Sequence, residues 1–398
     1  MGPACDNSMG PLPFLTVNRV NGIPLLRKSD VDWLRVMGTL AVFFYHNARF
    51  FNLGDWHVKN NELSPEIHLF VIFTDQWLMP LFFLLSGIGT YHSLAHHTFG
   101  QFILERTKRL VVPLVFGIVV FLIPVQVYIE RVSHGQFSGS FIEFYPEYFK
   151  GFYAFGGNFA WMGLHLWYLE VLFVFSLITI PLFALLKKRR VEQILQKGIG
   201  LIAFPFGYLI PVLLIFGVEI FNNSHLDTFG RREFGGWGLP AYWFFFICGY
   251  IFMTQPSYRE NMEKNRRRSL LFGITAFATV FFFFRQGFSN HVIAYSFLRG
   301  LNAWAWLAVF IGYAGRYFKE SNRFLQYAHP IVMPFYVLHQ TVIVMFGFFL
   351  ANCDMPVGLT FIILALCSFA VVIGFCEIVI THSKAMQFLF GMKRRQPV

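Results

Sequence analysis

The chain has 398 residues, of which 56% are hydrophobic, 20% aromatic and only 13% charged. Soluble domains carry about 25% charged residues, so this composition excludes an ordinary soluble protein and indicates an integral membrane protein. The net charge of +11 allows nucleic-acid binding, but the basic residues are distributed along the chain as a membrane-topology signal. Nucleic acid is therefore not an expected partner, whereas the lipid bilayer is.

Apolar runs of about 20 residues, each long enough to cross a bilayer as a helix, recur along the chain. They predict ten membrane helices, at residues 31–51, 67–91, 110–129, 165–186, 199–220, 237–254, 269–286, 291–314, 328–350 and 357–381. The predicted fold class is all-α, a polytopic transmembrane helix bundle of about ten spans. Residues 1–30 are predicted to form a cytoplasmic lead, 31–383 the membrane domain and 384–398 a basic cytoplasmic tail.

The basic residues alternate between the two sides of this predicted bundle. The termini and every second connection carry 23 of the 32 Lys and Arg residues, whereas the intervening connections carry seven. Positively charged segments stay on the cytoplasmic side, so both termini are predicted to be cytoplasmic in a multi-pass plasma-membrane protein. The longest outer connection, 130–164, is rich in aromatic residues and glycine. It is long enough to form a lid or an acceptor-binding surface.

The first predicted helix places two ionisable side chains on one face. Arg35 and His46 are eleven residues apart, which at 100° per residue comes to about three full turns. The helical rise separates them by about 16 Å, so the arginine lies near a membrane surface and the histidine deep in the bilayer. Between them the same face carries Gly38, Thr39 and Val42, which are small enough to leave a slot. Ionisable groups at such depth usually mark a substrate or proton pathway.

Other ionisable residues fall at a similar depth on other helices. Asp75, Glu170 and Arg299 are placed in the outer half of the membrane, and His339 falls near its middle. Intramembrane charges normally face a bundle interior or a wet cavity, so these residues are expected to converge with His46. Two alternatives stay open: Glu170 and Arg299 form a structural ion pair, or the histidines are packed at helix interfaces.

A basic cluster is expected at the cytoplasmic ends of the first and third helices. It consists of Arg35, Arg106, Lys108 and Arg109. Arg suits planar phosphate recognition and Lys binds phosphate as a point charge, so the cluster predicts a phosphate-bearing ligand. A ligand held there by its phosphates would reach His46 with a thin reactive arm through the slot. The alternative is that Arg106, Lys108 and Arg109 serve only as topology anchors.

Five segments, in this order, resemble the acyltransferase 3 family of membrane acyltransferases. They are DWLR with the spacing to His46, MPLFFLLSG, ERTKRLVVP, GLHLWYLEVL and FYVLHQTVIV. Together they span most of the chain, from about residue 30 to 380, and the HLWYLE segment is closest to the glucan-modifying branch. The one departure is Lys108, where a second adjacent arginine is common in the family.

The resemblance implies transfer of an acyl group, acetyl, succinyl or similar, from cytoplasmic acyl-coenzyme A (acyl-CoA) to a hydroxyl of an outer acceptor, mostly a glycan. It implies no metal, and it leaves the oligomeric state open. His46 matches the family's essential histidine and Arg35 its essential arginine, whereas Arg106 and Arg109 match its basic segment. The predicted site residues are His46, Glu170 and His339 in catalysis; Asp75, His165, Trp167 and Arg299 in acceptor binding; and Arg35, Arg106, Lys108 and Arg109 in donor binding.

Two mechanisms are compatible with this reading. In the first, a neutral His46 acts as general base on the acceptor hydroxyl, and Glu170 or Asp75 orients the imidazole. In the second, the acyl group is first transferred to a histidine and then to the acceptor. The rival function is a secondary transporter in which the same buried His, Glu and Arg residues form a proton or substrate pathway. Inverted repeats would favour a transporter, and none is evident in the sequence.

Overall fold

A computed structural model of the protein describes residues 19–20, 23–24, 29–201, 204, 206–224, 235–252, 255–285 and 292–392. In these residues the fold is all-helical apart from two paired two-residue strands, β1 (Arg19–Val20) and β2 (Ile23–Pro24). The rest of the predicted lead up to residue 28, and residues 393–398 of the predicted tail, lie outside the described residues.

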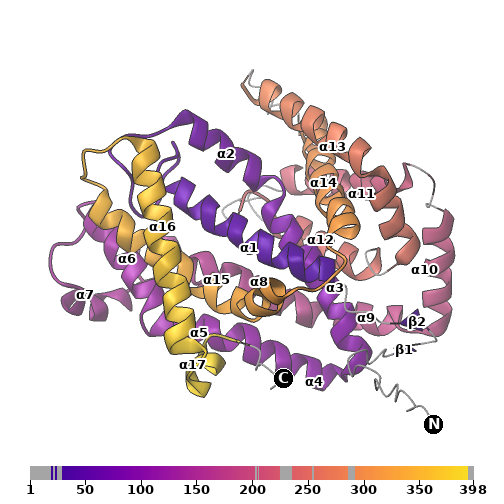
Figure 1. Cartoon of the computed structure of the whole chain (residues 1–398), viewed down its shortest axis with the longest axis horizontal. Coiled ribbons are helices and arrows are strands. Elements are labelled where there is room, and N and C mark those ends of the chain that lie inside the picture. Colours follow the sequence, from indigo (N-terminus) through magenta and orange to yellow (C-terminus); the bar gives the residue numbers. More distant parts are fainter. Residues whose placement is uncertain are drawn as a thin grey trace, which may run out of the picture.

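Helical residues occupy each of the ten predicted segments (Figure 1). The α-helices are α1 Ser29–Arg49, α2 Pro65–Asp75, α3 Leu78–His96, α4 Phe99–Arg106, α5 Val112–Val119, α6 Leu122–Ser133, α7 Phe141–Tyr148, α8 Trp167–Ile178, α9 Ile180–Leu186, α10 Arg189–Leu201, α11 Ile210–Ser224, α12 Leu239–Ile251, α13 Pro256–Arg285, α14 Val292–Tyr317, α15 Arg323–Leu350, α16 Val357–Phe375 and α17 Lys384–Leu389. Turns of π-helix join α4 to α5 at Thr107–Val111 and follow α16 at Cys376–Ile380. Helices α4, α7 and α17 were not predicted, and most of α10 lies outside the predicted segments.

The apolar helices of the described residues include several that are long enough to cross a membrane. Three helical stretches qualify by length and apolarity: Pro65–His96, Arg323–Leu350 and Val357–Ile380. Two bent pairs raise the number to five if each pair is a single span; they run from Phe99 to Ser133 and from Leu164 to Leu186, with bends of 41° and 51°. The prediction of ten spans remains a prediction.

Three of the predicted continuous helices are interrupted, and a proline explains each break. Pro80, Pro124 and Pro181 lie just after the breaks between α2 and α3, α5 and α6, and α8 and α9. A proline inside a helix donates no hydrogen bond, and its ring clashes with the carbonyl four residues earlier. The breaks therefore fall within the turn that precedes each proline.

Helix α1 lies in the middle of the bundle, where it contacts α2, α3, α14, α15 and α16 (Figure 1). At its start, Asp30 forms an ion pair with Arg259 before the seventh predicted helix, and Trp33 donates to the carbonyl of Glu320 between α14 and α15. Beyond its other end, His57 bonds to Glu130 near the end of α6. Connections predicted to be cytoplasmic thus meet at one end of α1, and connections predicted to be outside meet at the other.

Helices α3 and α12 cross in close contact at two glycines. A Cβ atom on Gly87 would lie 2.0 Å from the carbonyl oxygen of Phe246, and one on Gly249 would lie 2.0 Å from that of Leu84. Only glycine allows the two backbones to approach so closely, as in other membrane helix pairs. The close contact packs α12 against the helix that carries the SG segment.

Alanine at Gly87 is expected to push these backbones apart. Overpacking costs about 1–3 kcal/mol, and here the obstacle is backbone that cannot rotate away. Gly87→Ala should therefore lower the melting temperature of the detergent-solubilised protein, measured by a fluorescence thermal shift. Gly217→Ala is the matched control, because a Cβ there meets nothing within 4 Å. Equal melting temperatures for the two variants would contradict the packing account.

Candidate active site

A cavity of about 490 Å³ lies at the end of α1 that carries His46. Helices α1, α2, α3, α8 and α15 form its walls, together with the segments around Trp56, residues 153–162 and residues 235–236. Its size is typical of sites for small ligands. Segments far apart in the sequence thus enclose one space.

Two histidines from α1 and α15 are hydrogen-bonded at this cavity. His46 lines it, and its Nδ1 lies 2.9 Å from Nε2 of His339. Nδ1 of His339 in turn lies 2.6 Å from the carbonyl oxygen of Tyr336, one turn earlier on α15. The Tyr336 carbonyl therefore contacts His339, His339 contacts His46, and His46 faces the cavity.

This chain of contacts determines which ring nitrogens carry protons. A carbonyl oxygen only accepts, so Nδ1 of His339 must donate to Tyr336. A neutral His339 then accepts at Nε2, which requires His46 to donate from Nδ1. The remaining nitrogen of a neutral His46, Nε2, consequently holds a free lone pair. This is the form that a general base needs.

His165 lies beside this pair, but both of its ring nitrogens are engaged. Its Nε2 lies 3.2 Å from the carbonyl oxygen of Val337, and its Nδ1 lies 3.4 Å from the side-chain nitrogen of Gln126. Nε2 therefore donates and Nδ1 accepts. The carbonyl of His165 also accepts from the hydroxyl of Tyr336, which packs the segment before α8 against α15.

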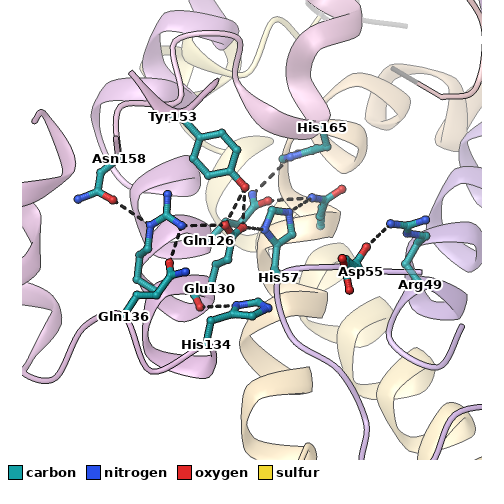
Figure 2. A network of polar contacts seen from close by, with 12 residues as sticks. Arg49, Asp55, His57, Gln126, Glu130, His134, Gln136, Tyr153, Asn158 and His165 are labelled. Carbon is teal, nitrogen blue, oxygen red and sulfur yellow. Dashed lines mark hydrogen bonds and ion pairs between the residues drawn. The ribbon is translucent and has the colours of Figure 1, made fainter. Parts of the chain in front are cut away.

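His57, the third histidine of the cavity lining, is also engaged at both nitrogens (Figure 2). Its Nδ1 bonds to the Glu130 carboxylate, and its Nε2 lies 3.1 Å from the side-chain nitrogen of Gln340. Gln340 also donates to Oε1 of Gln126 at 2.9 Å, which links His57 to His165 through two amides. Among the described residues, His46 is the cavity histidine that keeps an unengaged ring nitrogen.

Glu130 and its neighbour Arg131 bind the segment that follows α7 (Figure 2). Tyr153 donates to both carboxylate oxygens of Glu130, at 2.7 and 2.8 Å. Burial and this carboxylate raise the pKa of the Tyr153 phenol, so it remains a donor at neutral pH. Arg131 donates to Oδ1 of Asn158 at 2.9 Å and to the carbonyl of Gly157 at 2.8 Å. The predicted outer connection thus forms an ordered wall of the cavity.

Asp75 lies in the same cavity, at the break between α2 and α3. Tyr45 and Arg49 of α1 line the same cavity. The backbone carbonyl of Asp75 accepts from the indole of Trp237 at 3.2 Å. The helix break therefore positions both the carboxylate and the carbonyl of this residue.

Trp167 lines the cavity, and Arg299 lies behind its wall at Gly236. The Arg299 guanidinium lies over the ring of Trp237 at 4.1 Å, bonds to the carbonyl of Gly236 and lies 3.8 Å from the Glu219 carboxylate. Gly236 and Trp167 are part of the cavity lining. Arg299 thus stabilises the cavity wall at Gly236. The carboxylate next to Arg299 is that of Glu219, whereas Glu170 was expected there.

Glu170 does not join the residues around His46. It lies on α8 outside the cavity lining, and its Oε2 is buried with no hydrogen-bond partner among the described residues. The expected convergence therefore brings together His46, His339 and Asp75, with Arg299 at the wall. His339, rather than Glu170 or Asp75, contacts the imidazole of His46.

The predicted basic cluster lies toward the opposite end of α1. Arg35 pairs with Asp32 at 3.2 Å and donates to the carbonyl of Leu85 at 3.2 Å. A Cβ on Gly89 would lie 2.7 Å from Nη2 of Arg35, so glycine makes room for this side chain. Arg106 donates to Oγ1 of Thr90 at 2.8 Å.

The other two basic residues of the cluster belong to the π-helical turn before Pro113. Lys108 is exposed, and Arg109 is partly exposed and pairs with Glu105 at 3.4 Å. Proline cannot donate to the carbonyl of Arg109, so the backbone widens here. This carbonyl faces the segment after α17, where a Cβ on Gly391 would lie 2.8 Å from it.

The predicted slot between the basic cluster and His46 is partly filled. A Cβ on Gly38 would lie 3.2 Å from Cζ of Phe82, so this ring covers the small residue. Val42 does line the cavity, and Thr39 is buried. In the described conformation, Phe82 therefore separates the two ends of the face.

The family assignment follows from comparison with known proteins. A family model described as an acyltransferase domain, Acyl_transf_3, matches residues 28–380. The chain belongs to the acyltransferase 3 family. Members of this family are membrane proteins, in agreement with the apolar helices of the described residues. No solved structure matches it.

The similar curated proteins are named glucans biosynthesis protein C. The chain is 25% identical over 165 residues to the protein from an Escherichia coli strain, a match that covers 41% of each chain. A second E. coli sequence is 22% identical over 269 residues, 65% of this chain and 66% of the relative. The protein from Shigella dysenteriae is 24% identical over 165 residues, 41% of each chain. The matched parts thus span from two fifths to just under two thirds of these relatives.

Several residues of the site were missed from the sequence. Gln126 and Gln340 are isolated amides in apolar runs, and that isolation was a usable signal. His57 and Glu130 lie in polar surroundings, where nothing in the sequence distinguishes them from ordinary surface residues. Among the described residues, no three or more His, Cys, Asp or Glu side chains are grouped so that they could hold a metal ion.

Proposed function

We propose that this acyltransferase moves an acyl group from cytoplasmic acyl-CoA to a hydroxyl of a glycan on the outer side of the plasma membrane. The observation that carries the proposal is His46, which lines the cavity with Nε2 unengaged among the described residues. A glycan acceptor is supported by the name of the relatives, which are glucan biosynthesis proteins.

In the proposed reaction, Nε2 of His46 removes the proton from the acceptor hydroxyl as its oxygen attacks the thioester carbonyl. A carbon–oxygen bond forms and the carbon–sulfur bond breaks. The proton then passes from His46 to the departing sulfur, so coenzyme A leaves as the thiol and His46 returns to its neutral form. No metal enters this scheme.

His339 acts in this mechanism as a positioning residue. When His46 is protonated, its Nδ1 still donates to His339, and His339 still donates to the Tyr336 carbonyl. These contacts orient the ring and stabilise its cationic form, as the third member of a catalytic triad does. Asp75, His165, Trp167 and Arg299 are assigned to the acceptor side, and Glu170 has no part in the scheme.

We assign the donor phosphates to Arg35, Arg106, Lys108 and Arg109. Along α1, Arg35 and His46 are about 16 Å apart, so the phosphates and the reacting thioester would occupy different ends of one face. In the described conformation Phe82 covers Gly38, so its side chain must move before the acyl-bearing arm of coenzyme A can pass along α1 to His46. Rotation of this side chain would open the slot without moving a helix.

The proposal predicts thioester consumption that depends on an acceptor. Membranes containing the protein should release free thiol from acetyl-CoA when a glucose trisaccharide is added, as measured with a chromogenic thiol reagent. Membranes carrying His46→Gln protein should not. A secondary transporter has no reason to cleave the thioester, so absence of thiol release with any acceptor would favour that rival function.

The proposed arrangement has ten spans and cytoplasmic termini, and it predicts opposite labelling of two lysines. Both Lys150, after α7, and Lys188, between α9 and α10, are exposed. A membrane-impermeant maleimide should label Lys150→Cys in intact cells and Lys188→Cys only after permeabilisation, with wild-type protein as the blank for native cysteines. Labelling of Lys150→Cys from the cytoplasmic side alone would overturn the topology.

A further inference from the structure

The cavity lining contains two tryptophan rings that the scheme above does not use. Trp56 lies in the segment after α1, and Trp161 lies in the outer segment before α8; both line the cavity. Trp161 is 42% exposed, so it is not a core residue. Tyr153 and Trp167 add two further aromatic rings to the same lining.

We propose that Trp56 and Trp161 form a carbohydrate-binding subsite that holds a sugar ring of the acceptor. This inference rests on the proposed function and names the residues that recognise the substrate. One face of a pyranose ring presents C–H groups, which pack against an aromatic ring and leave the hydroxyls free at the edge. An indole offers a large, rigid surface for such contact.

The polar residues of the cavity suit the hydroxyls at the edge of a sugar. Asp75 offers carboxylate oxygens that accept, and Arg49 offers a guanidinium that donates. Each sugar hydroxyl both donates and accepts, so a carboxylate and a guanidinium in one cavity can bind different hydroxyls of the same sugar. A fatty alcohol has one hydroxyl and would leave most of these polar groups without a partner, which is costly in a desolvated site.

Both tryptophans lie in segments that are fixed by contacts within the protein, before any ligand binds. Trp56 directly precedes His57, which is bonded to Glu130. The segment of Trp161 is held by the Tyr153 and Arg131 contacts, and by a close approach in which a Cβ on Gly157 would lie 2.2 Å from the carbonyl carbon of Gly151. Pre-ordered groups lose little conformational entropy on binding, so these segments are suited to recognition.

The test compares variants of the two tryptophans with a matched control. Trp56→Ala and Trp161→Ala should each raise the KM for a glucose trisaccharide about tenfold, with little change in kcat or in the KM for acetyl-CoA. Trp161→Phe keeps an aromatic face and should recover most of the loss. Phe155→Ala is the control, because Phe155 lies in the same segment, is 86% exposed and does not line the cavity.

Direct binding separates this inference from the proposed function. In His46→Gln protein, which cannot transfer, the trisaccharide should bind as in wild type, and adding Trp161→Ala should weaken binding about tenfold. Trisaccharide transfer with an unchanged KM in both tryptophan variants would overturn the subsite and leave the function standing. Tryptophan-dependent binding without transfer by the wild type would overturn the function and leave the subsite standing. Preference for a long-chain alcohol over the trisaccharide would also overturn the subsite.

Discussion

Replacing His46 by glutamine is expected to lower the turnover number by more than about a hundredfold. General-base catalysis typically contributes 10²–10⁴-fold, and an amide of similar size cannot take up a proton at neutral pH. Glutamine can still hydrogen-bond to His339, so the helix packing and the binding of acyl-CoA should stay near normal. The measurement is acceptor-dependent thiol release by purified protein, with acyl-CoA affinity determined in parallel.

A surface histidine provides the control for this variant. His97 follows α3, is exposed and bonds to the backbone carbonyl of Ser93 one turn earlier, so His97→Gln should have wild-type turnover. If His46 were merely a packed interface residue, glutamine would be tolerated there too. A His46→Gln enzyme that retains more than a few per cent of wild-type turnover would remove this residue from the mechanism and direct attention to His339.

Loss of a donor-site arginine is expected to weaken acyl-CoA binding by about ten- to hundredfold. A hydrogen bond to a charged group contributes about 1.5–3 kcal/mol, which corresponds to this range. Arg35→Ala, Arg106→Ala and Arg109→Ala should therefore raise the Kd for acyl-CoA and leave the acceptor KM little changed. Arg→Lys substitutions should recover only part of the affinity, because the planar fork is lost.

The control for the donor site is a basic residue on the same predicted side of the membrane. Lys188 is exposed and lies outside the cluster, so Lys188→Ala should bind acyl-CoA as wild type does. Equilibrium dialysis with labelled acyl-CoA gives the Kd directly. Unchanged affinity in Arg106→Ala and Arg109→Ala would leave both residues as topology anchors.

Much of the architecture could be predicted because it depends on local pattern. Apolar runs predicted helix at every place where a long one lies, and α1 extends over Ser29–Arg49 against a predicted 31–51. Arg35 and His46 lie on this helix at the predicted spacing, since helical periodicity is a local property. The family assignment was also correct, because the segments that carry it are contiguous in the sequence.

The contacts across the bundle were harder to predict. Glu170 was assigned to the site from its depth and from the HLWYLE segment, and neither says which way a side chain points around its helix axis. The His57–Gln340 contact joins residues 283 positions apart, and no periodicity reports on such a pair. The breaks near Pro80, Pro124 and Pro181 were readable in principle, because interior prolines interrupt helices.

The most direct test of the acyltransferase mechanism is transfer of a labelled acyl group across a membrane. Purified protein is reconstituted in liposomes, with [¹⁴C]acetyl-CoA on one face and a glucose trisaccharide on the other. We predict labelled trisaccharide, an equal amount of free thiol on the donor side, and neither product with His46→Gln protein. Trisaccharide that crosses the membrane unlabelled while acetyl-CoA stays intact would contradict the account and identify a transporter.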